Sequence, residues 1–388
     1  MTFRTKELTC FTLFAFIGLL LVSFIAPGAA LTRKKATLDF VDSCLADRGA
    51  GYYSHPDGVS ADATIDTTIA AITLIDTFDY PVTNETYDEA LNVRNFIDNL
   101  RNKSDGDYGG FKNAEGAEDS MKATYQSLRL LDMFDATSTV NLSRFVNFVL
   151  ESQDDNGGFT ANPLANNTAD IFNTYYALKI LELTENLTKV HLGEVNTFVN
   201  SCRMSSNLYG GAPNATTESL VATSFAVSIY QEILTNESSA YLNFGFNNAV
   251  QDFLPDNTSP AGGVKDPVIS EDPLLSTTYF AVKLQESLEF NLLDESALKN
   301  WILDKQVSDG GFVEGSLEEP TASSSLEATY HALMCLYLFN SNTPELDNDV
   351  PWLLSQDLLI VVGVITASVL IAVVIITIYV KRKNKIQL

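Results

Sequence analysis

The chain has 388 residues, of which 46% are hydrophobic and 10% aromatic, so it can bury a large apolar core. Its 49 acidic and 24 basic side chains give a formal net charge of -25. This excess of negative charge repels phosphate backbones and argues against nucleic acid as a partner.

The first apolar segment covers residues 11–26, follows two basic residues and precedes Pro27-Gly28-Ala29-Ala30. This order of charge, apolar run and small residues is typical of a secretory signal peptide. We therefore assign residues 1–30 to a signal peptide that is removed near Ala30. The alternative is an uncleaved N-terminal anchor, which the basic run Arg33-Lys34-Lys35 keeps open.

From residue 38 to residue 340 the sequence repeats one unit of about 50 residues six times. Each unit opens with a segment of helical period that carries an aromatic residue followed by an aliphatic one. These pairs are Phe40-Val41, Phe96-Ile97, Phe148-Val149, Phe198-Val199, Phe253-Leu254 and Trp301-Ile302. The pattern predicts six half-buried outer helices.

A glycine turn and a second apolar helix complete each unit. Glycine supplies the positive φ that ends one helix and redirects the chain. The turns are Gly109-Gly110, Gly157-Gly158, Gly210-Gly211, Gly262-Gly263 and Gly310-Gly311, with Ala50-Gly51 as the degenerate first copy. The second helix places a threonine in register every time: Thr68, Thr124, Thr174, Thr223, Thr278 and Thr329. We expect these second helices to form an inner layer.

The first and last repeats indicate whether the array stays open or closes into a ring. One hairpin cannot bury its apolar stripe alone, and the ends of an open stack need a polar outer face. The first unit, Leu38 to Asp79, and the last, Ala297 to Asn340, both keep the full apolar pattern. We therefore expect these two units to cover each other and close a ring. An open solenoid is the alternative.

The segment after the repeats predicts membrane attachment. Residues 341–356 are short and polar and form a stalk, whereas residues 358–380 are an apolar run long enough to span a bilayer. The basic tail, residues 381–388, then lies in the cytoplasm by the positive-inside rule. This predicts a single-pass protein of the cell membrane with an extracytoplasmic ring.

Eight Asn-x-Ser/Thr sequons fit an extracytoplasmic ring. They are Asn84, Asn102, Asn141, Asn166, Asn186, Asn214, Asn236 and Asn257, and we expect glycosylation at some of them. Cysteines are sparse, and Cys44 and Cys202 occupy matching outer-helix positions in the first and fourth units. A closed ring would hold these two on opposite sides, so we expect no disulfide between them.

Two of the units resemble a known family. The relevant stretches are Gln153-x-x-x-Gly157-Gly158-Phe159 with Thr174-Tyr175-Tyr176-Ala177-Leu178, and Gln306-x-x-x-Gly310-Gly311-Phe312 with Thr329-Tyr330-His331-Ala332-Leu333. They are similar to the repeats of protein prenyltransferase β-subunits and of squalene and terpene cyclases. The resemblance covers roughly residues 38 to 340. It implies an all-α fold, an α/α toroid of six helical hairpins around an apolar funnel, which in the family holds an isoprenoid.

The resemblance also implies where a zinc ion would bind. In prenyltransferases an Asp and a Cys from one inner helix and a His from a later one hold the metal, and His331 stands where that His would stand. One unit earlier, Leu275 occupies the Cys position and Pro273 the Asp position. Zinc remains possible as a cofactor if Asp272, His331 and Cys335 form an improvised site. The other interpretation is a core histidine beside a buried thiol.

The cyclase motif Asp-x-Asp-Asp does not occur in this chain. In addition, prenyl diphosphates and the proteins that normally accept them are cytoplasmic, whereas this ring is expected outside. We therefore expect the ring to bind a lipid, an isoprenoid or a peptide, with Thr174, Tyr175, Tyr279 and Tyr330 lining or supporting the funnel. The alternatives are an isoprenoid-handling transferase with zinc on His331, a terpene-cyclase-like enzyme, and a surface adhesion module.

Overall fold

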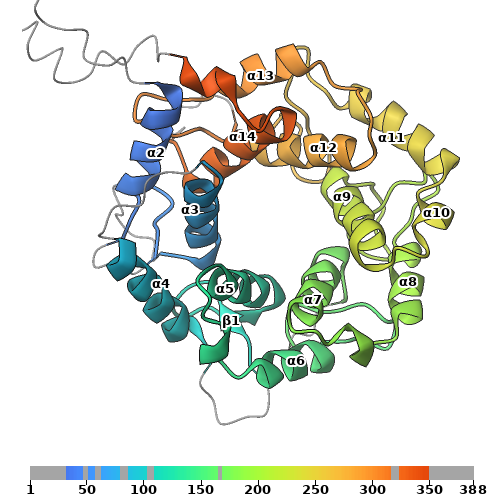
Figure 1. Ribbon diagram of the computed structural model, residues 1–388. Coiled ribbons are helices and arrows are strands. Elements are labelled where there is room, and N and C mark those ends of the chain that lie inside the picture. Colours follow the sequence, from blue (N-terminus) through green and yellow to red (C-terminus); the bar gives the residue numbers. More distant parts are fainter. Residues whose placement is uncertain are drawn as a thin grey trace, which may run out of the picture. The chain divides into compact units, whose positions relative to one another are not determined.

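The computed structural model describes residues 32–46, 51–56, 63–78, 86–102, 109–164, 168–315 and 323–348. Within the compact unit Ala36–Pro344, two concentric layers of helices form a ring (Figure 1). The inner helices are α3 (Ile65–Thr77), α5 (Met121–Met133), α7 (Ile171–Leu183), α9 (Leu220–Ser228), α12 (Leu275–Ser287) and α14 (Leu326–Phe339). The outer helices are α2 (Arg33–Ser43), α4 (Thr86–Leu100), α6 (Leu142–Glu151), α8 (Leu192–Ser201), α11 (Phe244–Asp256) and α13 (Glu295–Leu303). The predicted toroid of six helical hairpins is thereby confirmed.

Short elements connect these helices: β1 (Phe111–Lys112), β2 (Asp119–Ser120), η2 (Thr137–Thr139), η3 (Leu187–Lys189), the π-helix η4 (Ile229–Ile233), α10 (Ser238–Tyr241) and η5 (Pro344–Asp347). β1 and β2 form a two-stranded antiparallel sheet with Phe111 opposite Ser120. The sequence pattern did not predict this sheet. It forms in the turn of the second repeat, where the chain crosses back from the outer to the inner helix.

The threonine column ties each glycine turn to the inner helix that follows it. The six threonines are buried, and each Oγ1 accepts a hydrogen bond of 2.9 to 3.1 Å from a main-chain N–H of the preceding turn. The donors are Tyr52, Phe111, Phe159, Tyr209, Val264 and Phe312. These bonds satisfy N–H groups that would otherwise be buried without a partner.

The aromatic residue of five of the six outer helices packs on a glycine of the preceding repeat, and α11 is the exception. A Cβ atom on Gly158 would lie 2.6 Å from the ring of Phe198, and one on Gly110 would lie 2.9 Å from Phe148. The last and first repeats make the same contact, since a Cβ on Gly311 would lie 2.7 Å from the ring of Phe40. The two motifs of the repeat are therefore halves of one contact between neighbouring repeats.

Main-chain hydrogen bonds also join consecutive repeats. The first N–H of an inner helix donates to a carbonyl in the next turn, as Met121 does to Ala161 over 2.8 Å and Ile171 to Gly211 over 2.9 Å. Leu326 of the last inner helix donates to Ser54 of the first repeat, again over 2.8 Å. The last repeat is therefore joined to the first by the same kind of bond that joins consecutive repeats. The ring is closed, and the open solenoid is excluded for this unit.

The junction between the fourth and fifth repeats departs from the pattern. There the fully buried carboxylate of Asp266 accepts bonds from Ser219 Oγ at 2.7 Å and from the N–H of Val221, the second residue of α9, at 3.0 Å. Its other oxygen accepts the N–H of Val268 at 3.0 Å. A buried carboxylate of the fifth repeat therefore ties the start of α9 to that repeat.

Most of the predictions about the two chain ends concern residues that the structure does not describe. Of the stretches outside the ring unit, the structure describes residues 32–35 and 345–348, which are joined by a hydrogen bond of 3.0 Å from the Arg33 N–H to the Asn348 carbonyl. The expected signal peptide, transmembrane segment 358–380 and tail 381–388 lie outside the described residues. Within the described residues, every helix is too short or too polar to cross a membrane.

Candidate functional site

A cavity of about 380 Å³ lies inside the ring and is lined by side chains from all six inner helices. The lining residues occupy the second, fifth, sixth and ninth positions of these helices, whereas the threonine column occupies the fourth. All inner helices begin at the turn side, so equal positions form layers across the ring. The second and ninth positions are about 10 Å apart along a helix.

The first layer is charged and internally paired. Lys122 Nζ lies 2.6 Å from Asp66 Oδ1, and Gln126 Nε2 donates to the same oxygen at 2.8 Å. Glu327 accepts a hydrogen bond of 2.5 Å from Ser54 Oγ. Both carboxylates of the cavity wall therefore already have partners.

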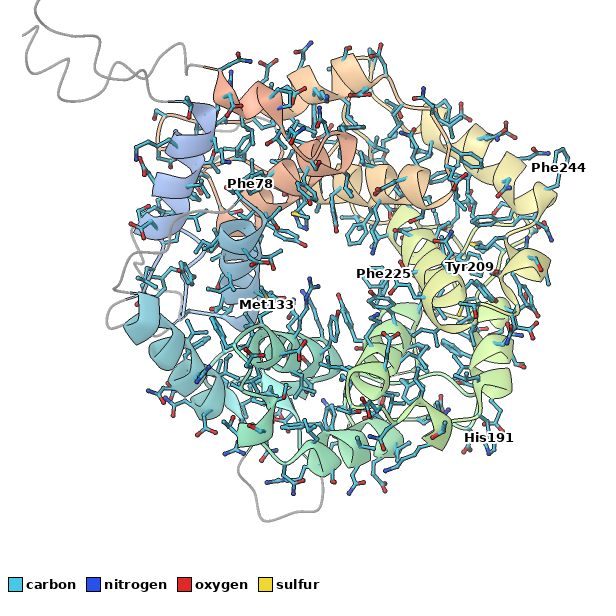
Figure 2. The ribbon with its side chains drawn as sticks, in the orientation of Figure 1. Phe78, Met133, His191, Tyr209, Phe225 and Phe244 are labelled. Atoms are coloured by element: carbon cyan, nitrogen blue, oxygen red, sulfur yellow. The ribbon has the colours of Figure 1, made fainter. Side chains whose placement is uncertain are left out.

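The middle layer is a belt of seven aromatic side chains: Tyr125, Tyr175, Tyr176, Phe225, Tyr279, Phe280 and Tyr330. Phe225 points into the centre of the ring (Figure 2) and meets Tyr175 edge to face, with ring centroids 5.1 Å apart. Burial raises the pKa of Tyr175 and of Tyr279, so both phenols stay neutral. The belt offers apolar ring faces together with a few hydroxyl groups.

The third layer carries Thr73, Arg129 and Lys283. The Lys283 ammonium lies 5.9 Å from the centroid of the Tyr175 ring, in the range of a cation–π contact. Burial lowers the pKa of Lys283, the nearby Lys179 and Arg129 lower it further, and Glu232 and Glu286 partly offset this. The third layer is therefore the cationic end of the cavity.

His331 belongs to the middle layer and packs against Tyr279 with ring centroids 5.5 Å apart. Burial, with a smaller contribution from Lys122, lowers the pKa of His331 to about 4, so the imidazole is neutral near pH 7. Its Nδ1 atom and Oε1 of Gln126 are buried and have no hydrogen-bond partner in the described part of the chain.

The candidate zinc ligands are not brought together. Asp272 is exposed in the loop before α12, whereas Cys335 is fully buried within α14. Burial raises the pKa of the Cys335 thiol well above its usual range, which disfavours the thiolate that zinc requires. Among the residues that the structure describes, no three His, Cys, Asp or Glu side chains group as a metal site. His331 and Cys335 lie four residues apart on α14, and of the two only His331 faces the cavity.

The four candidate ligand-binding residues divide into two groups. Tyr175, Tyr279 and Tyr330 line the cavity. Thr174 is fully buried, and its Oγ1 bonds the Phe159 N–H at 3.1 Å and the Asp170 carbonyl at 2.7 Å. Thr174 is therefore a structural member of the threonine column and does not contact the cavity.

Sequence reasoning missed Phe225, Arg129 and Lys283. The repeat register carried a signal for them, because Arg129 and Lys283 occupy the same helix position, five residues after the column threonine. The three buried cysteines, Cys44, Cys202 and Cys335, are free. Burial raises the pKa of both Cys44 and Cys202 to about 12.

The sequons differ in accessibility. Three asparagines are exposed: Asn141, Asn214 and Asn236. Three others are half-buried and donate side-chain hydrogen bonds: Asn102, Asn186 and Asn257. The remaining two, Asn84 and Asn166, lie outside the described residues. Steric access therefore favours the first group for modification.

The fold has known relatives. Protein geranylgeranyltransferase-I of Candida albicans, solved in complex with GGPP, superposes with a TM-score of 0.63 at 16% identity, covering 81% of this chain and 93% of that chain. The type II terpene cyclase MstE from Scytonema gives 0.54 at 12% identity, covering 80% and 97%. A GH76 alpha-mannanase of Bacteroides thetaiotaomicron gives 0.56 at 13% identity, covering 80% and 95%. Such identities show a shared fold and leave the activity open.

Sequence comparison identifies the family directly. A comparison with curated proteins finds no match. The family described as Prenyltransferase alpha-alpha toroid domain matches residues 5–171 and 165–363, which together span most of the sequence. This agrees with the repeats, the closed ring and the layered inner helices. The chain belongs to the prenyltransferase alpha-alpha toroid family.

Proposed function

We propose that the ring is the extracytoplasmic ligand-binding domain of a single-pass membrane protein and that its central cavity holds a small lipid or isoprenoid. The observation that carries this proposal is the aromatic belt around a cavity of about 380 Å³. Protein pockets for small molecules have this size and this mixture of ring faces with few polar groups.

Binding accounts for this wall better than zinc-dependent transfer. A catalytic zinc needs three protein ligands around one point. Here His331 faces the cavity, Asp272 is exposed on a loop, and Cys335 is buried inside its helix. The remaining cavity groups are neutral phenols and paired or cationic side chains, which can orient a ligand.

The membrane part of the proposal rests on the sequence. The apolar run 358–380 and the basic tail 381–388 support an anchor with a cytoplasmic end. The exposed sequons Asn141, Asn214 and Asn236 would carry glycans on the outer side. Endoglycosidase treatment of the full-length protein from a eukaryotic host tests this topology. An unchanged electrophoretic mobility, together with protease protection of the ring in intact cells, would contradict it.

The ligand is tested on the full-length protein in detergent, purified without added metal or chelator. Released molecules are identified by mass spectrometry and bound metal by elemental analysis. We expect an apolar molecule to copurify and Thr73→Trp, which narrows the cavity, to abolish its retention. Leu164→Trp, at a loop position that is 78% exposed, is the matched control.

The outcomes separate the hypotheses. Retention by the parent and the Leu164→Trp control, but not by Thr73→Trp, supports a ligand inside the ring. Stoichiometric zinc that is lost on His331→Ala would favour the transferase alternative. Absence of any retained molecule, with no binding of added C10 isoprenoids, would overturn the proposal.

A further inference from the structure

A second pocket lies at the edge of the fourth repeat, away from the central cavity. It has a volume of about 130 Å³ and is lined by the start of α8 and by the segment that follows the π-helix η4. Three of its residues, Gly193, Asn236 and Glu237, are exposed, so the pocket opens at the protein surface. It shares no lining residue with the central cavity.

One wall of this pocket carries the sequon Asn236-Glu237-Ser238. The main chain around the asparagine forms a turn, in which the Glu237 N–H donates to the Leu234 carbonyl at 2.9 Å. The Ser238 Oγ donates to the Thr235 carbonyl, also at 2.9 Å. A glycan on Asn236 would therefore begin at the rim of the pocket, from a main chain that is held in place.

The opposite wall contains a glycine that the protein's own packing does not require. Gly193 lies in the first turn of α8, and a Cβ added there would meet nothing within 4 Å. Glycine also lowers helix stability relative to alanine. It is favoured where another group lies close to the main chain. The open space over Gly193 is suited to a flat ring that packs on the helix.

The polar groups of the pocket match those of a neutral sugar. The half-buried Asn196 accepts a hydrogen bond from the Tyr230 hydroxyl at 3.3 Å and donates one to the Tyr241 hydroxyl at 3.4 Å. Its Nδ2 has a second hydrogen, which finds no acceptor among the described residues. Glu237 forms no ion pair within the described part of the chain and adds a carboxylate acceptor.

The remaining surface of the pocket is apolar and carries no positive charge. Leu192 and Ile233 are half-buried in its wall and can contact the C–H face of a pyranose ring. Because Glu237 is the charged residue of the lining, an anionic ligand such as a phosphate would be repelled. The lining therefore favours an uncharged ring that carries hydroxyl or amide groups.

We propose that the first sugar residue of an N-linked glycan on Asn236, a pyranose with an acetamido group, occupies this pocket and packs on Gly193. The covalent link supplies the high local concentration that a shallow pocket needs. The sugar would join the start of α8 to the segment after η4 and stabilise both. This inference rests on the proposed extracytoplasmic topology and is independent of any ligand in the central cavity.

The test uses the full-length protein in detergent, made in a eukaryotic host and trimmed by an endoglycosidase to one N-acetylglucosamine per site. Hydrogen exchange followed by mass spectrometry compares the parent with Asn236→Gln. We expect peptides from the first turn of α8 to exchange at least about fivefold more slowly in the parent, because the sugar suppresses local opening there. The first turn of α13, an outer helix without a sequon, is the internal control.

Further variants separate the sugar from the asparagine side chain. Ser238→Ala removes the sequon but keeps Asn236, and it should exchange like Asn236→Gln. Ser238→Thr keeps the sequon and should exchange like the parent. Asn214→Gln removes a different exposed site and should leave α8 unchanged. In Gly193→Leu, whose side chain fills the pocket, loss of the Asn236 glycan should no longer alter exchange at α8.

The outcomes distinguish this inference from the proposed topology. If Asn141, Asn214 and Asn236 all lack glycans, the topology fails and takes this inference with it. If the first two are occupied and Asn236 is empty, or if α8 exchanges equally in the parent and in Asn236→Gln, this inference alone is overturned. Protection of Asn236→Gln by added free N-acetylglucosamine would overturn the covalent assignment. Unchanged exchange at α13 shows that a variant has folded.

Discussion

Thr329 and His331 lie two residues apart on α14 and have different surroundings. Thr329 is fully buried, and its Oγ1 bonds the Phe312 N–H at 3.0 Å and the Ser325 carbonyl at 2.7 Å. His331 faces the cavity, and its Nδ1 has no partner among the described residues. One residue fixes the turn, and the other forms part of the cavity wall.

The neutral imidazole of His331 makes stability depend on pH. Its pKa is about 4, against 6.5 ordinarily, so between these values the unfolded chain binds a proton that the folded chain does not. Above pH 6.5 the imidazole is neutral in both states, so it does not change the free energy of unfolding. Below pH 6.5 the free energy of unfolding decreases as the pH falls toward 4. At pH 4.5 we expect a loss of about 2–3 kcal/mol from this group. Urea unfolding of the parent and of His331→Gln at pH 7.5 and 4.5 measures the difference.

His191→Gln is the control, because His191 is exposed on the outer rim (Figure 2). Other groups also titrate in this range, so the informative quantity is the pH dependence of the parent minus that of each variant. Identical pH profiles for the parent and His331→Gln would contradict the neutral buried imidazole.

At the scale of elements, a glycine and an aromatic ring from consecutive repeats form one joint. Gly158, in the turn after α6, lies against Phe198 of α8. The contact requires glycine at this position, because any side chain there would occupy the volume of the aromatic ring of Phe198. The fourth turn is the exception, because Gly211 lies against Phe172 of the inner helix α7 and not against an outer-helix ring. The buried Asp266 carboxylate holds this junction through its hydrogen bond from Ser219. The repeat tolerates an exception where another contact replaces the lost one.

Gly158→Ala should destabilise the ring by about 1–3 kcal/mol, since overpacking a dense core has costs of this order. The new Cβ would lie 2.6 Å from Phe198. Gly193→Ala is the matched control. Gly193 lies on α8, the helix of Phe198, and an added Cβ there meets nothing within 4 Å. It should be neutral or slightly stabilising, because alanine favours helix. Chemical unfolding compares both variants, and equal effects would refute the joint.

At the scale of the whole ring unit, closure makes the first and last repeats equivalent to any other neighbours. The Leu326 N–H bonds Ser54 over 2.8 Å, as Met121 bonds Ala161 over 2.8 Å. Side chains cross the same seam, with Gln306 Nε2 donating to Thr37 Oγ1 at 3.0 Å. Because no repeat is terminal, none of them needs a polar cap.

Hydrogen exchange tests the seam. We expect the N-terminal amides of α14 to be protected as strongly as those of α5, because both donate to the next repeat. Exchange followed by mass spectrometry on peptides covering Leu326 and Met121 makes the comparison within one protein. Gln306→Ala should raise exchange at α14 more than at α5. Fast exchange at α14 in the parent protein would mean that the ring opens at this point in solution.

The sequence by itself determined the repeat, its two helices and the family resemblance, and it favoured closure of the ring. It could do so because each depends on local period or on a pattern copied six times, such as the glycine turn and the column threonine. The register also placed Tyr175, Tyr279 and Tyr330 near the centre, and all three line the cavity.

The tertiary structure decided which face of each helix meets the cavity and which groups there lack partners. Thr174 and Tyr175 are adjacent in sequence, yet only Tyr175 reaches the cavity, because the threonine hydroxyl is taken by the turn. Likewise Lys179 and Lys283 share one helix position, but of the two only Lys179 forms ion pairs among the described residues, with Glu182 on its own helix and Glu232 on a neighbouring element. Partners supplied by other helices have no fixed sequence spacing, so the different surroundings of the two lysines became visible only in the folded ring.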